Sequence, residues 1–393
     1  MRFAIVVPII ASMMIFGLSG CGKIPTWGEL TGEQKPTEPT PPPAPPTPPP
    51  APPVMAKGPS PQEIIARFKA SRPGDVSDAK ILELTSLNEG LEEVTEINAD
   101  HSGITQNAFQ SIDKLTNLRQ LRLNATHVGD DACTRIAQVP SLEVLTLVDT
   151  AVSDVGVAAL SGLQNLKVLH LTRCKLSENG YAAIGKFPAL QEINIDQTNL
   201  DNRMLDLVCN AKTLVSLELS KDHIDDYGLA ALGKLSSLEH LTLAETAVTG
   251  AGLVAAQHKG GLKNLNYLNL YKCPLSSQGA KAVSNFKSLE TLILGEIRAL
   301  DDFHLKVIIS GMKNLKNLDL VKCSNINGSG LQPLSGHKEI EEIHLSGCSL
   351  IGDPVVKILK TLKNLKKASL GGTAITPNAV MELRFALPEL VVQ

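Results

Sequence analysis

Aliphatic residues recur along this chain at spacings typical of a short strand followed by a short helix. In residues 142–165, LEVLTLVDTAVSDVGVAALSGLQN, Leu145 and Leu147 alternate with positions that are free to face solvent, which predicts a strand with one buried face. The letters SDVGVAALSGL then predict a helix, with Ser153 or Asp154 placed to cap it. Its apolar positions are Val155, Val157, Leu160 and Leu163.

The same arrangement returns at once in residues 166–189 and then along most of the chain. On the pattern L-x-x-L-x-L-x-x-T/C-x-L, twelve units begin at Val94, Leu118, Leu142, Leu166, Leu190, Leu214, Leu238, Leu265, Leu289, Leu315, Ile340 and Leu365. Most steps are 24 residues, the others are 25 to 27, and Leu390 begins a thirteenth unit. One unit cannot bury its leucines alone, so we expect stacked copies to share a continuous core.

This pattern is the leucine-rich repeat signature, and the chain resembles the cysteine-containing and ribonuclease-inhibitor-like class of these proteins. The resemblance implies an α/β solenoid, a horseshoe with a parallel inner sheet, outer helices and about twelve repeats. It also implies that the residue eight positions after each unit start bonds the backbone at the turn. That slot holds Thr126, Thr150, Cys174, Thr198, Thr246, Cys273, Cys323, Cys348 and Thr373, whereas Asp222 and Ile297 break the pattern.

Both ends of the repeat array carry segments suited to closing it. Ser60, Pro61 and Glu63 form a capping-box pattern that predicts a helix, and SDAKILELTSL predicts a second one. The letters AVMELRFALPEL are expected to close the other end, which would complete the domain. We therefore divide the chain into a signal peptide (1–20), a lipidated cysteine with a proline-rich linker (21–60), a helical cap (61–93) and the repeat domain (94–393).

The first residues indicate export and attachment to a membrane. Arg2 precedes an apolar run that is too short to span a bilayer and that suits a signal peptide. The following LSGC, which ends at Cys21, resembles the lipobox of bacterial lipoproteins. The resemblance implies lipidation of Cys21, and Gly22 after it favours the outer membrane if the cell has one. The alternative is an ordinary signal peptide with a free cysteine nearby.

A proline-rich stretch separates this segment from the repeats. Residues 36–61 hold 14 of the 24 prolines, which exclude helix and sheet interior and favour a stiff polyproline II spacer with a reach of roughly 80 Å. We expect this stretch to hold the folded domain off the membrane. A ligand for proline-recognising domains is the alternative.

Composition and motifs give little sign of chemistry. The formal net charge of −3 does not point to nucleic acid. No phosphate loop, CxxC pair, HExxH or nucleophile elbow occurs, so we expect no enzyme, cofactor or metal. An enzyme with a site built across repeats is a remote alternative.

Cys323 and Cys348, in consecutive turn slots, could form a disulfide, but we favour free buried thiols.

The surface is left to carry function. Residues two, four and six positions after each unit start should line the concave face, where one cluster combines aromatic and polar groups. It consists of His240, Tyr267, Asn269 and Tyr271, and we predict that it binds a partner. A second, acidic group is interpreted as solvated charge; it comprises Glu192, Asp196 and Glu218, with Glu96 and Asp100 further along.

Charge is also uneven along the repeats. The stretch KILKTLKNLKK is expected to place five lysines near one outer face, where they could contact an anionic surface: Lys357, Lys360, Lys363, Lys366 and Lys367. We predict a monomeric, membrane-anchored scaffold of the bacterial cell envelope that binds a protein partner and no nucleic acid. The alternative is a structural envelope protein that contacts cell-wall glycan or lipid through the basic C-terminal end.

Overall fold

The computed structural model describes residues 58–393. The predictions about the signal peptide, Cys21 and the proline-rich stretch before residue 58 fall outside the described residues. No helix within residues 58–393 is both long and apolar enough to cross a membrane.

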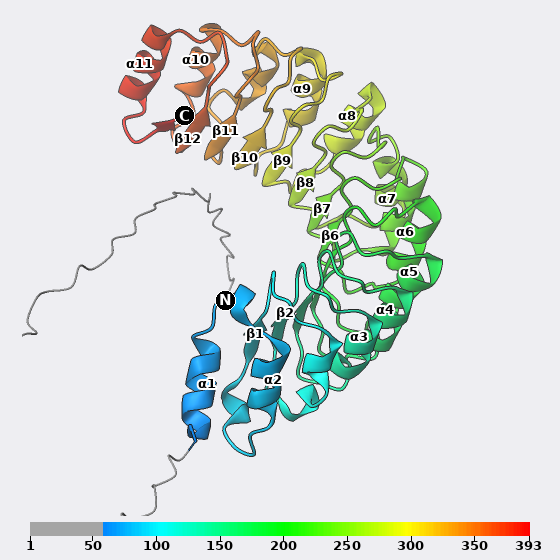
Figure 1. Ribbon diagram of the computed structural model, residues 1–393. Helices are drawn as coiled ribbons and strands as arrows, with labels where there is room; N and C mark the ends of the chain where they lie inside the picture. Colours follow the sequence, from blue (N-terminus) through cyan, green and yellow to red (C-terminus); the bar gives the residue numbers. More distant parts are fainter. Residues whose placement is uncertain (1–57) are drawn as a thin grey trace, which may run out of the picture. The chain divides into compact units, whose positions relative to one another are not determined.

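Each repeat contributes one strand to a single parallel sheet. The strands follow sequence order from β1 to β13 and line the inner side of an arc (Figure 1). Neighbouring strands pair with a shift of one repeat, as between Leu217 in β6 and Leu241 in β7. The strands are β1 (Glu96–Asn98), β2 (Gln120–Arg122), β3 (Val144–Thr146), β4 (Val168–His170), β5 (Glu192–Asn194), β6 (Ser216–Glu218), β7 (His240–Thr242), β8 (Tyr267–Asn269), β9 (Thr291–Ile293), β10 (Asn317–Asp319), β11 (Glu342–His344), β12 (Lys367–Ser369) and β13 (Val391–Val392).

Helices cover the outer side of the arc (Figure 1). The α-helices are α1 (Pro61–Lys69), α2 (Asp78–Thr85), α3 (Asp130–Ile136), α4 (Asp154–Leu160), α5 (Glu178–Ile184), α6 (Asn202–Val208), α7 (Leu253–His258), α8 (Ser277–Val283), α9 (Asp302–Ile309), α10 (Pro354–Leu359) and α11 (Pro377–Ala386). The 3-10 helices are η1 (Pro73–Asp75), η2 (Leu91–Glu93), η3 (Gln106–Phe109), η4 (Ile112–Lys114), η5 (Gly228–Lys234) and η6 (Ser329–Leu334).

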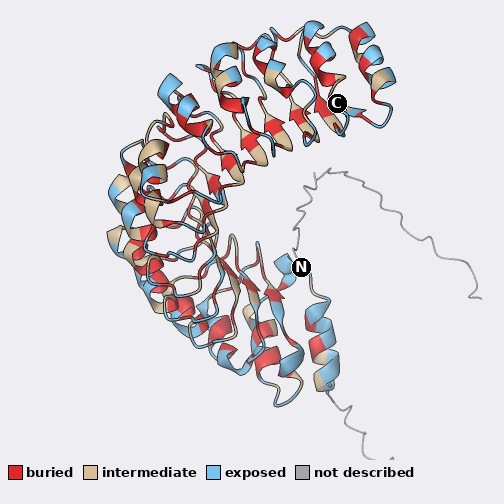
Figure 2. Cartoon of the chain, turned by 180° about the vertical axis from the view of Figure 1, so that it is seen from behind, coloured by how far each residue is buried: buried red, intermediate tan, exposed pale blue. Residues whose placement is uncertain are grey.

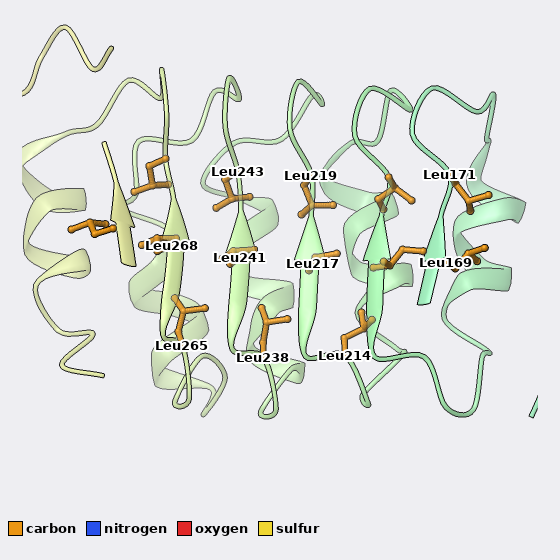
Figure 3. Packing of buried hydrophobic residues seen from close by; sticks show 14 of the residues in the cluster. Leu169, Leu171, Leu214, Leu217, Leu219, Leu238, Leu241, Leu243, Leu265 and Leu268 are labelled. Atoms are coloured by element: carbon orange, nitrogen blue, oxygen red, sulfur yellow. The ribbon is translucent and has the colours of Figure 1, made fainter. Parts of the chain in front are cut away.

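The core is a set of aliphatic columns that run between sheet and helices. Figure 3 shows Leu217 and Leu219 beside Leu241 and Leu243 of the next repeat, and all four side chains are fully buried. Burying one leucine contributes about 1.5–3 kcal/mol, and every repeat adds several. Buried residues accordingly form a continuous layer inside the arc (Figure 2). The predicted leucine-rich repeat solenoid is confirmed, including the thirteenth strand that follows Leu390.

The predicted helix starts are also confirmed. Ser60 and Glu63 bond each other's backbone amides at the start of α1, which is a capping box, and Ser77 accepts a bond from the Lys80 amide at the start of α2. One residue departs from the prediction. Val155, expected on the apolar face of α4, is 65% exposed, because Gly156 in the same first turn is the residue that packs against the preceding repeat.

The turn slot bonds the backbone, but threonine and cysteine do so differently. Thr150 donates to the Leu147 carbonyl of its own repeat at 2.7 Å, whereas Cys174 donates back to that same carbonyl at 3.2 Å from the next repeat. Thr126, Thr198, Thr246 and Thr373 follow the first mode, and Cys273, Cys323 and Cys348 the second. All six cysteines within residues 58–393 are free and buried.

An aspartate at the start of one helix bonds the start of the next repeat's helix. Asp130 accepts hydrogen bonds from the amides of Ser153 at 2.8 Å and Gly156 at 2.9 Å. Asp226 and Asp302 make equivalent bonds one repeat onward. The carboxylate thereby satisfies amides that every helix start leaves unpaired. We call this arrangement the aspartate clamp.

A glycine leaves room for each of these clamps, so adding a methyl group there should destabilise the fold. At Gly330, a Cβ atom would lie 2.7 Å from the Asp302 carbonyl oxygen and 2.9 Å from its Cα. We expect Gly330→Ala to lower the free energy of unfolding in urea by about 1–3 kcal/mol. Gly162→Ala is the matched control, because a Cβ there meets nothing within 4 Å. Equal stability of the two variants would contradict this account of the glycines.

Candidate functional site

His240 and Tyr267 stand side by side on the concave face. They are register partners in β7 and β8, and their rings are 5.5 Å apart at an angle of 33°. His240 is exposed and Tyr267 is half-buried. The middle residue of each of these strands is buried, so the two rings are carried on the outward side of the sheet. The structure therefore brings together the first two residues of the predicted cluster.

Asn269 lies on β8 with Tyr267, two residues before Tyr271. Its side-chain oxygen accepts a hydrogen bond from the Tyr271 amide at 2.9 Å. Asn269 and Tyr271 are both half-buried. All four predicted residues thus lie on two adjacent repeats, where they offer aromatic area together with polar tips. Groups of this kind are enriched at protein-binding hot spots.

Tyr271 is held by the repeat that follows it. Its interaction with the Glu296 carboxylate raises the pKa of the phenol. The Lys272 ammonium lies 5.2 Å from the centre of its ring, within the range of a cation–π contact. A Cβ atom at Gly295 would lie 3.0 Å from the ring, so the ring lies against backbone that carries no side chain.

Glu296 belongs to a row of alternating charges that the sequence analysis did not identify. The row, which we call the ion ladder, lies along one border of the concave face, seven positions after successive unit starts. It consists of Lys221, Glu245, Lys272, Glu296 and Lys322. Successive nitrogen–oxygen distances are 3.6, 3.7, 3.4 and 2.7 Å. Hydrogen bonds from Lys322 and Tyr271 lower the pKa of Glu296 to about 2.

The residues of the ion ladder share an unusual backbone conformation. All five residues have φ between 55° and 60°, a left-handed conformation that is uncommon outside glycine. Alternating signs at a fixed offset are visible in the sequence, so this ladder could have been found by aligning the repeats on charge as well as on leucine. Exposed ion pairs contribute little individually. Their place beside Tyr271 makes them the border of the candidate site.

The acidic group lies on the neighbouring strands and is more tightly bonded than expected. His170 contacts Glu192 at 2.9 Å, and the bond lowers the pKa of that carboxyl. Asn194 donates to Glu218, whose pKa is raised by burial and by the nearby Asp196. These carboxylates are half-buried, so they are less solvated than the sequence interpretation assumes. Glu96 is exposed and pairs with Arg122 at 3.8 Å.

The predicted lysine cluster is divided between two parts of the solenoid. Lys357 is exposed on helix α10, whereas Lys367 lies on strand β12 in register with Glu342. The expectation that the five lysines share one outer face is therefore wrong. The reason is that KILKTLKNLKK continues from a helix through a turn into a strand, so its lysines project from different sides of the repeat.

Several of these lysines are also paired with carboxylates. Lys360 contacts Glu382 at 2.6 Å and Lys366 contacts Glu341 at 2.7 Å. Lys363 donates to a backbone carbonyl of the same turn. The pairing reduces the positive charge available to an anionic surface, and contact with such a surface stays a prediction.

Asp222 is the one carboxylate placed in a turn slot. It is 5% exposed, and one of its oxygens accepts from the amides of Thr198 and Leu200 in the preceding repeat. The other oxygen is buried without a hydrogen-bond partner. Burial raises the pKa of this carboxyl from 3.8 to about 7 despite those bonds. Asp222 therefore fills the slot as an acceptor, where threonine and cysteine donate.

Comparison with known proteins identifies the architecture. No family model matches the chain, and no curated protein matches it in sequence. Among solved structures, it is similar to the internalin InlF from Listeria monocytogenes, with 20% sequence identity, a TM-score of 0.52 and coverage of 84% of this chain and 93% of that one. The chain has the leucine-rich repeat fold.

A second solved structure with similarity to this chain comes from Arabidopsis thaliana. It is the leucine-rich repeat ectodomain of the membrane receptor kinase GASSHO1/SCHENGEN3, in complex with CASPARIAN STRIP INTEGRITY FACTOR 2. Sequence identity is 20%, the TM-score is 0.48, and the match covers 76% of this chain and 37% of that one.

Within residues 58–393, no group of three histidine, cysteine or acidic side chains could hold a metal ion.

The raised pKa of Asp222 predicts a pH dependence of stability. Since the folded state binds this proton more tightly than the unfolded chain, Asp222 destabilises the fold increasingly as pH rises from 3.8 to about 7. In urea unfolding, the free energy of unfolding of Asp222→Asn should rise relative to that of the wild type by more than about 1 kcal/mol across that window.

The control for this experiment is Asp131→Asn, because Asp131 is exposed on α3. Its free energy of unfolding should stay parallel to that of the wild type at every pH. If Asp222→Asn also ran parallel to the wild type, the buried carboxyl would not titrate as described.

Proposed function

We propose that this protein is a recognition scaffold, anchored by lipid in the bacterial cell envelope, whose concave face binds a protein partner without enzymatic activity. The observation that carries the proposal is the cluster of His240, Tyr267, Asn269 and Tyr271 on two adjacent repeats. Curved repeat surfaces commonly serve as binding faces, and function on such a fold resides in the site it displays.

The concave face is suited to binding because the core does not use it. The columns of buried leucines lie behind the strands, so residues on the concave side are free to vary without loss of the fold. Tyr267 and His240 expose aromatic surface next to half-buried carboxylates on β5 and β6. A partner that covers this region would bury aromatic area and donate hydrogen bonds to Glu192 and Glu218.

The export and anchoring part of the proposal rests on the sequence. The charge, the apolar run and LSGC at the N-terminus support lipidation at Cys21, and the proline-rich stretch supports a spacer between lipid and repeats. Two or three acyl chains would hold the protein firmly, because each buried methylene contributes about 0.8 kcal/mol.

The binding site can be tested by removing the two tyrosines. The partner is first captured by crosslinking in the native cell, and its purified form is then titrated onto the full chain. Tyr267→Ala with Tyr271→Ala is expected to weaken binding by at least about tenfold, the loss of a hot spot, while unfolding stays cooperative with a similar thermal midpoint.

Tyr227→Ala provides the matched control for that experiment. Tyr227 is a third tyrosine, 89% exposed, at the start of η5 on the helical side of the repeat. Its removal should leave the dissociation constant unchanged. Equal binding by the double variant and the wild type would place the partner elsewhere on the protein.

The anchor has a separate test. In cells, Cys21→Ser should move the protein from the membrane fraction to the soluble exported fraction, and intact mass should show the loss of acyl chains. The repeat domain should keep its affinity for the partner in solution. A variant that stayed in the membrane fraction would argue against lipidation at Cys21.

A further inference from the structure

Three side chains on the outer side of the arc form a hydrogen-bonded series. The Ser277 hydroxyl lies 2.6 Å from Nε2 of His304, and Nδ1 of the same ring lies 2.7 Å from the Asp301 carboxylate. Ser277 belongs to the repeat that contains α8, and the other two residues to the repeat that contains α9. Ser277 is exposed, whereas His304 is partly covered.

The order of donors follows from the chemistry of the groups. An ionised carboxylate can only accept, so Nδ1 carries the ring proton and Nε2 is left to accept from the serine hydroxyl. Asp301 stays ionised because hydrogen bonds from the His304 amide and ring lower its pKa. A serine, a histidine that accepts its proton and a carboxylate that orients the ring are the arrangement that activates serine for nucleophilic attack.

This joint between repeats departs from the aspartate clamp. At other joints the first helical residue is an aspartate, such as Asp130 in α3 or Asp302 in α9, and it bonds the amides of the next repeat. In α8 the first residue is Ser277, and its contact with the next repeat goes to the His304 ring. Phe303 beside that ring is 67% exposed, with its ring centre 5.7 Å from that of His304.

We propose that Ser277 is a nucleophile activated by His304 and positioned by Asp301, and that it takes an acyl or phosphonyl group from an activated ester or fluorophosphonate. Phe303 offers an exposed apolar surface for the acyl chain. The proposal concerns the outer side of the arc and is independent of partner binding at the concave face.

The step balances as an acyl transfer. The Ser277 oxygen bonds the carbonyl carbon of an ester while its proton passes to Nε2 of His304. The tetrahedral adduct then expels the alcohol, which takes that proton, and leaves an acyl-serine with neutral histidine. With a fluorophosphonate the new bond is oxygen to phosphorus, and fluoride leaves with the proton.

The alternative is that the three residues only join two repeats, and chemical labelling separates the two roles. The full chain is treated with a fluorophosphonate probe at neutral pH, and the modified residue is located by peptide mass spectrometry. We expect labelling at Ser277 at least about tenfold faster than at Ser329, in line with the effect of a general base. Ser329 is likewise exposed at the first residue of a helix, η6.

Two conservative variants decide the roles of the other residues. His304→Gln keeps a hydrogen-bonding side chain but lacks the basic nitrogen, and Asp301→Asn keeps a good helix cap but not the charge that orients the ring. Both should lower labelling of Ser277 to the rate at Ser329 while urea unfolding stays cooperative. Labelling spread evenly over serines, or unaffected by His304→Gln, would overturn the proposal and leave a structural joint.

Discussion

Translation by one repeat is the constraint on which this structure depends. Each strand pairs with its neighbour at the same offset, so every side chain lies beside its own counterpart in the adjacent repeats. For leucine this is favourable, because identical branched side chains fill a column and exclude water along its length. The fully buried column through Leu217, Leu241 and Leu268 is the result. The same translation places polar side chains in rows. Each polar side chain must then find a bonding partner although a similar group lies beside it in the next repeat.

The protein meets that second demand in three ways. In the turn slots, threonine donates to a carbonyl of its own repeat and cysteine to one of the preceding repeat, so that neighbouring slots can share one acceptor, as Thr150 and Cys174 share the Leu147 carbonyl. At the helix starts, an aspartate accepts hydrogen bonds from amides of the next repeat. Along the border of the concave face, charge alternates in sign from Lys221 to Lys322. Asp222 is the exception: one of its carboxylate oxygens is buried without a hydrogen-bond partner, and burial raises its pKa.

This division explains what the sequence could predict. The leucine period determines which residues are buried, and the strand positions follow from it across thirteen repeats. Partners along a row depend on side-chain reach between repeats, which periodicity does not contain. The leucine period alone therefore misplaces Val155 in the core and the five lysines on one face, and it shows the ion ladder only when the repeats are also aligned on charge. The cluster around Tyr267 was found because two aromatic residues at equivalent offsets need only the register to meet.

The separation of columns from rows also explains how such a chain can acquire binding and reactivity without loss of stability. The buried columns supply the hydrophobic stabilisation, whereas concave rows and helix starts contribute bonds worth only about 1 kcal/mol each. A substitution in a row therefore leaves the arc intact and changes what the surface displays. Tyr267 differs from its register neighbours His240 and Thr291, and Ser277 is the first residue of α8 where the next helix, α9, begins with Asp302. In this fold, function should be sought at surface positions whose residue differs from its counterparts in the adjacent repeats while the buried leucines are kept.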